Sequence, residues 1–136
     1  MMTEKKPAPG GAEIKVNVTP AKGGVTIAEL VAGREKLAGS EVVLRGKVTK
    51  YKADILGANW LHVRDASSER DLVVTTKAEV KVGDTVLIRG RLERDVNLGA
   101  GYSYELFIRN AEVTVEKVPL ERLYMAILVL LNNFMH

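Results

Sequence analysis

EVVLRGKVTKY, residues 41–51, has the alternating pattern of a β-strand with one buried face. Successive side chains of a strand point to opposite faces, so the side that carries Val42, Leu44, Gly46 and Val48 is expected to face a core. Gly46 interrupts this apolar side, as is typical where a strand must coil sharply around a barrel. The stretch therefore predicts the first strand of a small closed β-barrel.

Four further strand-like segments follow, at residues 60–65, 71–76, 85–94 and 102–115. Gly90 lies inside the segment 85–94 as Gly46 lies inside the first strand. Turn residues at Gly83-Asp84 and Gly99-Ala100-Gly101 separate the later segments, and no long helix intervenes. Short strands in this arrangement predict an all-β fold, a five-stranded OB-fold barrel rather than a sandwich.

A short helix is predicted immediately before the first strand. Thr26 can cap it, and Glu29 stands three residues later, as in a capping box. Four apolar residues recur at helical spacing behind this cap: Ile27, Leu30, Val31 and Leu37. Gly39 is expected to end the helix.

The chain of 136 residues has the size of one domain with tails, and its sequence divides into three regions. Residues 1–24 are rich in proline and glycine and are expected to form a flexible linker. Residues 25–115 form the predicted OB-fold domain. Residues 116–136 are an apolar tail that is expected to be helical, because Pro119 suits a first helical turn.

The apolar tail is not expected to span a membrane. Its uninterrupted run, residues 123–131, is about half as long as the roughly 20 residues that a spanning helix needs. A helix over 120–134 is expected to dock on the barrel or to mediate self-association. Contact with a membrane surface and an extension without defined packing are the alternatives.

The composition shows no apparatus for catalysis. The chain has no cysteine and 2 histidines, His62 and His136, which excludes disulfides and thiolate sites and leaves no paired histidine ligands. No Ser/His/Asp constellation can be proposed. We therefore predict a protein that is not an enzyme and that uses no metal and no cofactor.

A binding surface for single-stranded nucleic acid needs aromatic faces for base stacking and cations that follow the phosphates. In an OB-fold the face around strands 2 and 3 is the usual binding surface. The candidate contact residues are Arg45, Lys47, Tyr51, Lys52, Trp60, His62, Arg64, Arg89, Arg91 and Tyr102. Trp60 is the best candidate for stacking, and it shares a strand face with His62 and Arg64.

Each of these residues also has a structural explanation. Trp60 can be part of the barrel packing, and outward arginines and lysines can pair with glutamates across strands. His62 can be a surface residue without a ligand. Tyr104 is expected to seal the barrel end, whereas for Tyr102 both sealing and contact with a ligand stay open. The aromatic content of 5% weakens the nucleic-acid interpretation. A balance of 20 Lys and Arg against 17 Asp and Glu cannot drive strong non-specific binding to a polyanion.

Several short motifs resemble a bacterial family of small OB-fold proteins. They are WLHVRD at 60–65, DLVVTT at 71–76, Gly83-Asp84 and Gly99-Ala100-Gly101-Tyr102. The likeness spans roughly residues 25–113 and includes the leading helix. Proteins of this family are described as nucleic-acid-binding or DNA-binding, and many look exported. The second strand is also similar to that of the anticodon-binding OB domains of aminoacyl-tRNA synthetases, in which an aromatic at the place of Trp60 stacks on a base.

The resemblance implies an OB-fold module that binds single-stranded DNA or RNA, and an exported, periplasmic location. Two features depart from the family. Ala66 stands where the family often has glycine, and the chain opens without the signal sequence of exported members, which leaves a cytoplasmic location open. Two other functions are considered: an exported module that binds a protein or small ligand, and an accessory domain of a longer protein.

Overall fold

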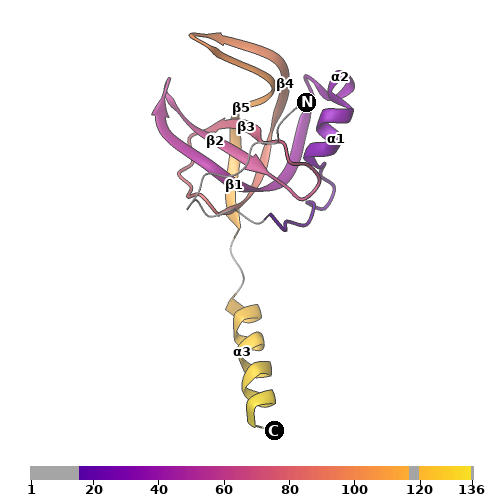
Figure 1. The fold of residues 1–136 in the computed structure, drawn as a ribbon, viewed down its shortest axis with the longest axis vertical. Coiled ribbons are helices and arrows are strands. Elements are labelled where there is room, and N and C mark those ends of the chain that lie inside the picture. The colour runs from indigo at the N-terminus through magenta and orange to yellow at the C-terminus, as the bar shows by residue number, and fades with distance from the viewer. Residues whose placement is uncertain (1–15, 117–119, 136) are drawn as a thin grey trace, which may run out of the picture.

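The computed structural model describes residues 16–116 and 120–135 and contains a closed sheet of five strands (Figure 1). Its elements are α1 (Ile27–Ala32), α2 (Arg34–Leu37), β1 (Glu41–Ile55), β2 (Ala58–Arg64), β3 (Leu72–Thr76), β4 (Thr85–Gly99), β5 (Tyr102–Glu116) and α3 (Leu120–Met135). The strands hydrogen-bond in the order β1-β2-β3-β5-β4, and β4 pairs back onto β1. β3 and β5 run parallel, and the other neighbouring strands are antiparallel. The predicted OB-fold barrel is therefore confirmed.

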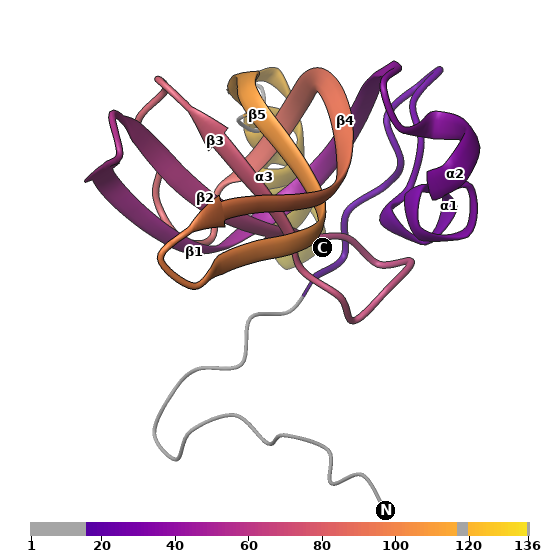
Figure 2. The same cartoon turned by 90° about the horizontal axis from the view of Figure 1, so that it is seen from above.

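Two long hairpins project from the barrel (Figures 1 and 2). β1 pairs with β2 as far as Ile55, and β4 pairs with β5 as far as Gly99. Both strands are longer than the sequence predicted. The two-residue turns that close the hairpins, Leu56-Gly57 and Ala100-Gly101, have positive φ at both central positions, a geometry that suits the twist of paired strands.

A bulge in β1 reverses which residues of the rest of the strand face the barrel core. The pairing of β1 with β2 skips Thr49, between Val48 and Lys50. The alternation shifts by one residue at such a bulge, and Tyr51 packs against the barrel core. The prediction that Tyr51 faces outward is therefore wrong. Lys50 and Lys52 take the outward positions, and both side chains are exposed.

The barrel interior holds the main hydrophobic core. Its largest fully buried side chains come from all five strands and from α1: Ile27, Leu30, Leu44, Leu61, Leu72, Ile88, Leu92 and Ile108. α1 lies beside the barrel, where its apolar side joins this core (Figure 2). Burial of these side chains supplies the main stabilisation of the fold.

The helix before β1 begins as predicted but is broken near its middle. Thr26 Oγ1 accepts a hydrogen bond from Glu29 N, and Glu29 Oε1 accepts one from Thr26 N, which completes the capping box. Gly33 ends α1, and α2 follows directly. The predicted single helix up to Gly39 is thus two short helices.

Asp65, at the end of β2, fixes α1 to the barrel. Its side chain is buried, and its Oδ2 accepts a hydrogen bond from Ile27 N at 2.8 Å. Its Oδ1 accepts one from Ser67 N at 3.0 Å. A buried carboxylate of this kind satisfies an open N–H group of the helix, so Asp65 has a structural role.

Gly46 and Gly90 lie where strands approach closely. A Cβ atom on Gly90 would lie 2.5 Å from Ile108 Cγ2 and 3.4 Å from Ala111 Cβ. A Cβ atom on Gly46 would lie 3.3 Å from the carbonyl oxygen of Arg64. β4 also changes its register against β5 next to Gly90. Close approach therefore explains the glycine at both places.

Residues 16–25 form no helix or strand, and yet they lie against the barrel. Val18 is buried, and Arg45 Nη1 donates a hydrogen bond to the carbonyl oxygen of Thr19 at 3.1 Å. These contacts hold the segment beside β1. The rest of the predicted linker, residues 1–15, lies outside the described residues.

The helical tail is confirmed, and α3 lies apart from the barrel (Figure 1). The side chains of residues 125–135 are all exposed, so the expectation that this part docks on the barrel is wrong. Its exposed large apolar residues are Met125, Ile127, Leu128, Val129, Leu130, Leu131, Phe134 and Met135. Among the described residues, no helix has the length and apolar character that crossing a membrane requires.

Candidate binding face between two hairpins

A second hydrophobic cluster lies outside the barrel core. Trp60, Val73 and Phe107 come from β2, β3 and β5, and they alternate with residues that point into the barrel. The β4–β5 hairpin packs over them with Val96. Ile55, Leu98 and Tyr104 complete the cluster as partly buried neighbours. The cluster therefore occupies the outer face of strands 2 and 3, where an OB-fold usually binds its ligand.

Four of the seven aromatic residues of the chain gather on this face. The ring centroid of Trp60 lies 5.6 Å from that of Tyr102, 5.9 Å from that of Tyr104 and 5.7 Å from that of Phe107. Tyr104 and Phe107 are stacked at 5.4 Å. Burial raises the pKa of Tyr104, and the neighbouring Tyr102 raises it further. Tyr104 therefore packs into the outer cluster as a partly buried neighbour.

Trp60 does not offer a ring face to solvent. Its side chain is 8% exposed, and Nε1 donates a hydrogen bond to the carbonyl oxygen of Ile55 at 2.8 Å. The expectation of an exposed stacking platform at Trp60 is therefore wrong, because the β4–β5 hairpin is long enough to cover the ring. Tyr102, at 36% exposed, is the most exposed of the four aromatic residues on this face.

A groove of about 360 Å³ lies between the two hairpins, and we call it the hairpin groove. Its volume is in the range of small-ligand sites, about 300–1,000 Å³. It is lined by Leu56, Gly57, Ala58, Trp60, Thr75, Lys77, Leu98, Phe107, Arg109 and Asn110. Residues of the β1–β2 turn form one wall, and β5 forms the other.

Asp71 lies between His62 and Arg64 on the same outer face. Asp71 Oδ1 accepts a hydrogen bond from Arg64 Nε at 2.8 Å, and Oδ2 lies 3.4 Å from His62 Nδ1. Burial pushes the pKa of Asp71 upward, but the hydrogen bond with His62 and the charge of Arg64 outweigh this effect and lower the pKa. His62 and Arg64 are close together, as predicted, but the Asp71 carboxylate neutralises much of the charge of Arg64.

The other predicted cations lie mostly on a different part of the barrel. Arg45, Arg89 and Arg91 belong to the β1–β4 ladder, away from the hairpin groove. Arg45 donates two hydrogen bonds to Glu116, and hydrogen bonding with Arg45 lowers the pKa of that glutamate. Arg89 lies 3.6 Å from Glu112, and Arg91 donates to the Gly39 carbonyl oxygen. Lys47 lies opposite Arg64, between the two groups. The predicted cations therefore do not gather on one face of the barrel.

Two cations of the hairpin groove were missed by the sequence analysis. Lys77 Nζ donates a hydrogen bond to the Gly57 carbonyl oxygen at 2.7 Å, which links the end of β3 to the β1–β2 turn. Arg109 makes two hydrogen bonds of 3.0 Å to Glu93 and lies 5.5 Å from the Phe107 ring centroid. The alternation of apolar residues along β5 places Arg109 on the side away from the core, so the sequence pattern could have identified it.

Lys50 and Lys52 border the same face from β1. Lys50 lies opposite His62, and Lys52 lies opposite Trp60. Neither ammonium group comes within ion-pair distance of a carboxylate among the described residues. In the part of the chain that the structure describes, no three histidines or carboxylates lie close enough to hold a metal ion.

No model of a known protein family matches the chain, and no curated protein matches it in sequence. The resemblance to small OB-fold proteins therefore stays a prediction. An OB-fold serves many unrelated functions, so a functional argument must rest on the site itself.

Proposed function

We propose that this protein is a noncatalytic binding module that holds single-stranded nucleic acid on the face of the hairpin groove. The observation that carries the proposal is the gathering of four aromatic rings on the outer face of β2, β3 and β5. A chain with 5% aromatic residues concentrates them where an OB-fold binds its ligand. Bases stack on exposed aromatic rings, of which Tyr102 offers one here, and nearby cations contact the phosphates.

The roles of the side chains follow from their exposure. Tyr102 lies at the rim of the face and offers the accessible ring, and Trp60 supports it from behind. Lys50 and Lys52 are the cations available to phosphates, because their ammonium groups face no carboxylate among the described residues. His62 and Arg64 contribute less, since Asp71 holds both.

The test is a titration of the single tryptophan with mixed-sequence single-stranded oligonucleotides and a duplex control, at several salt concentrations. We expect saturable quenching that prefers single strands. Tyr102→Ala should weaken binding by about 1–3 kcal/mol, the usual contribution of one stacked base. The double variant Lys50→Gln/Lys52→Gln should reduce the slope of log K against log salt by about 0.7 for each lost phosphate contact.

Lys36→Gln is the matched control, because Lys36 is an exposed lysine of α2, far from the hairpin groove in the fold. This variant should bind as the unchanged protein does. Unchanged tryptophan emission together with no comigration of oligonucleotide at low salt would overturn the nucleic-acid proposal. Equal salt slopes for the double variant and the control would overturn the role given to Lys50 and Lys52.

A protein or small ligand in the same groove is the second candidate. Two observations favour it. Six arginines are paired with carboxylates, namely Arg45, Arg64, Arg70, Arg89, Arg94 and Arg109. Leu56, at the tip of the β1–β2 hairpin, is 72% exposed. An exposed leucine beside an apolar groove suits a protein contact. An exported, periplasmic location belongs to this candidate, and a signal sequence in the full-length gene product would support it.

A further inference from the structure

β5 continues beyond the end of its partner β3. The last pair of the parallel ladder joins Thr76 to Ala111, whereas β5 runs to Glu116. Residues 112–116 are paired with β4 alone among the described strands. One edge of this part of β5 is therefore open.

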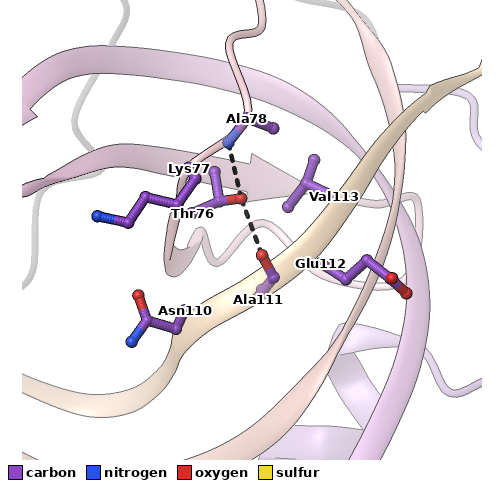
Figure 3. A pocket seen from close by; sticks show the side chains of 7 residues that line it. All are labelled: Thr76, Lys77, Ala78, Asn110, Ala111, Glu112 and Val113. Atoms are coloured by element: carbon purple, nitrogen blue, oxygen red, sulfur yellow. Dashed lines mark hydrogen bonds between the residues drawn. The ribbon is translucent and has the colours of Figure 1, made fainter.

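The orientation of the open backbone groups can be worked out from one hydrogen bond. Thr76 Oγ1 donates to the carbonyl oxygen of Ala111 at 2.8 Å, so the Ala111 peptide groups point away from β4 (Figure 3). The direction of the backbone N–H and C=O groups alternates from one residue to the next along a strand. The groups of Val113 and Val115 therefore point away from β4, as those of Ala111 do. No described segment pairs with them on that side.

A groove of about 410 Å³ lies along this edge, and we call it the β5 edge groove. It is lined by Thr76, Lys77, Ala78, Asn110, Ala111, Glu112 and Val113 (Figure 3). The chain leaving β3 forms one wall, and β5 forms the other. The Val113 side chain is half-buried, and the ammonium and carboxylate groups of Lys77 and Glu112 lie at the rim (Figure 3).

We propose that the β5 edge groove binds an extended peptide segment of another protein, which adds a strand to β5 at residues 112–116. An open edge is a template for such pairing, with main-chain hydrogen bonds giving affinity and alternate side chains giving specificity. The fitting segment alternates apolar residues, which cover Val113 and Val115, with basic residues, which face Glu112. The Glu112 side chain is 76% exposed, and its carboxylate lies 3.6 Å from the Arg89 guanidinium.

Other occupants fit this groove less well. Nucleic acid would bring phosphates against Glu112. A second copy would have to insert the edge of its own barrel between β5 and the wall at residues 76–78. An antiparallel pair of two such edges centred on Glu112 or on Thr114 would also set glutamates opposite each other.

The inference is separate from the proposed nucleic-acid function. Lys77 and Asn110 line both grooves, but the hairpin groove lies on the outer face of the sheet and the β5 edge groove lies along its open edge. Absence of binding at one groove would therefore leave the proposal for the other groove unaffected. Variants at Lys50 and Lys52 should therefore leave peptide binding unchanged.

The experiment titrates the isotope-labelled full chain with the capped heptapeptide KVKVKVK and follows backbone amide resonances. We expect saturable shifts in residues 76–78 and 110–116. The matched control is the same peptide with every backbone nitrogen methylated, which keeps the charges but removes the donors. It should bind at least about tenfold more weakly, because several main-chain hydrogen bonds are lost.

Two variants keep the test decisive. Val113→Pro removes an N–H group that faces the groove and spares the ladder with β4, so it should abolish binding. If this variant does not fold, Glu112→Lys provides the test: it should weaken binding of KVKVKVK and strengthen binding of EVEVEVE. Equal binding of the methylated peptide, or shifts confined to the hairpin groove, would overturn the proposal. A concentration-dependent dimer that pairs through residues 112–116 would overturn it in favour of a second copy.

Discussion

On the outer face, the Asp71 carboxylate contacts both His62 and Arg64. This carboxylate is half-buried and accepts hydrogen bonds from Arg64 and from Thr49 Oγ1, while His62 lies beside it. Burial alone would favour the neutral acid, but the hydrogen bond with His62 and the charge of Arg64 favour the charged form and lower the pKa. The ionised carboxylate therefore contributes to folding as well as to the charge of the face.

This lowered pKa makes a prediction about stability and pH. A carboxyl group whose pKa is lower in the folded state contributes stability that is complete above its unfolded pKa, about 3.9, and that is lost as pH falls through the folded pKa. We expect Asp71→Asn to be less stable than the unchanged protein at pH 7 by at most about 1 kcal/mol, because the partners are partly exposed. The difference should shrink below about pH 4.

Denaturant unfolding from pH 7 to pH 2 measures this difference. Asp54→Asn is the control, since Asp54 is an exposed carboxylate of the β1–β2 hairpin with no ion pair to a described residue. Its stability difference from the unchanged protein should not vary with pH in the same way. A difference for Asp71→Asn that grows on acidification would contradict the assignment.

At the scale of the elements, neighbouring strands approach closely where one of them has a glycine, which carries no side chain. Gly90 of β4 faces Ile108 and Ala111 of β5, and a Cβ atom there would lie 2.5 Å from the nearest side-chain carbon. We expect Gly90→Ala to lower the free energy of unfolding by about 1–3 kcal/mol, as overpacking of a filled core does. The φ angle of Gly90 is not positive, so the effect measures contact alone.

Gly46→Ala is the comparison for this variant. Its added Cβ atom would lie 3.3 Å from the nearest atom, so a shift of a few tenths of an ångström relieves it. It should destabilise the protein less than Gly90→Ala does in the same thermal or denaturant experiment. The opposite order would show that β4 and β5 separate at Gly90 more easily than their packing indicates.

The elements also show which features the sequence could predict. Strict alternation at 41–48 and at 85–92 predicted two strands and their buried faces correctly, because each pattern reports a local period. The bulge at Thr49 has no such signal, and the faces of Tyr51 and Lys52 were therefore not predictable from alternation alone. The burial of Trp60 depends on a hairpin about forty residues further along the chain, a tertiary contact that no local pattern reports.

At the scale of the whole molecule, α3 contributes little to the stability of the barrel. The side chains of residues 125–135 are exposed, and a short isolated helix is marginal in water. We expect removal of residues 120–136 to change the free energy of unfolding of the barrel by less than about 0.5 kcal/mol. The full chain should self-associate through its exposed apolar helix, and the truncated chain should be monomeric by sedimentation.

Leu30→Ala is the matched control for this truncation, because Leu30 comes from a helix that packs into the core and is 0% exposed. It should cost about 2–5 kcal/mol. A large loss of stability on removing α3 would show that the tail packs on the barrel in solution. Self-association that survives the truncation would assign it to another surface.

Closure of the sheet sets the order in which the chain can fold. The β1–β4 ladder joins residues as distant in sequence as Glu41 and Arg91, and the β3–β5 ladder joins Val73 to Phe107. The two hairpins can form within microseconds, because their partners are neighbours along the chain. The closing ladders require large loops to be ordered first, so ring closure is the slow event, on the millisecond-to-second scale of all-β topologies. Until then the edges of β1, β3, β4 and β5 stay open, and the nascent chain is most prone to aggregation in that interval.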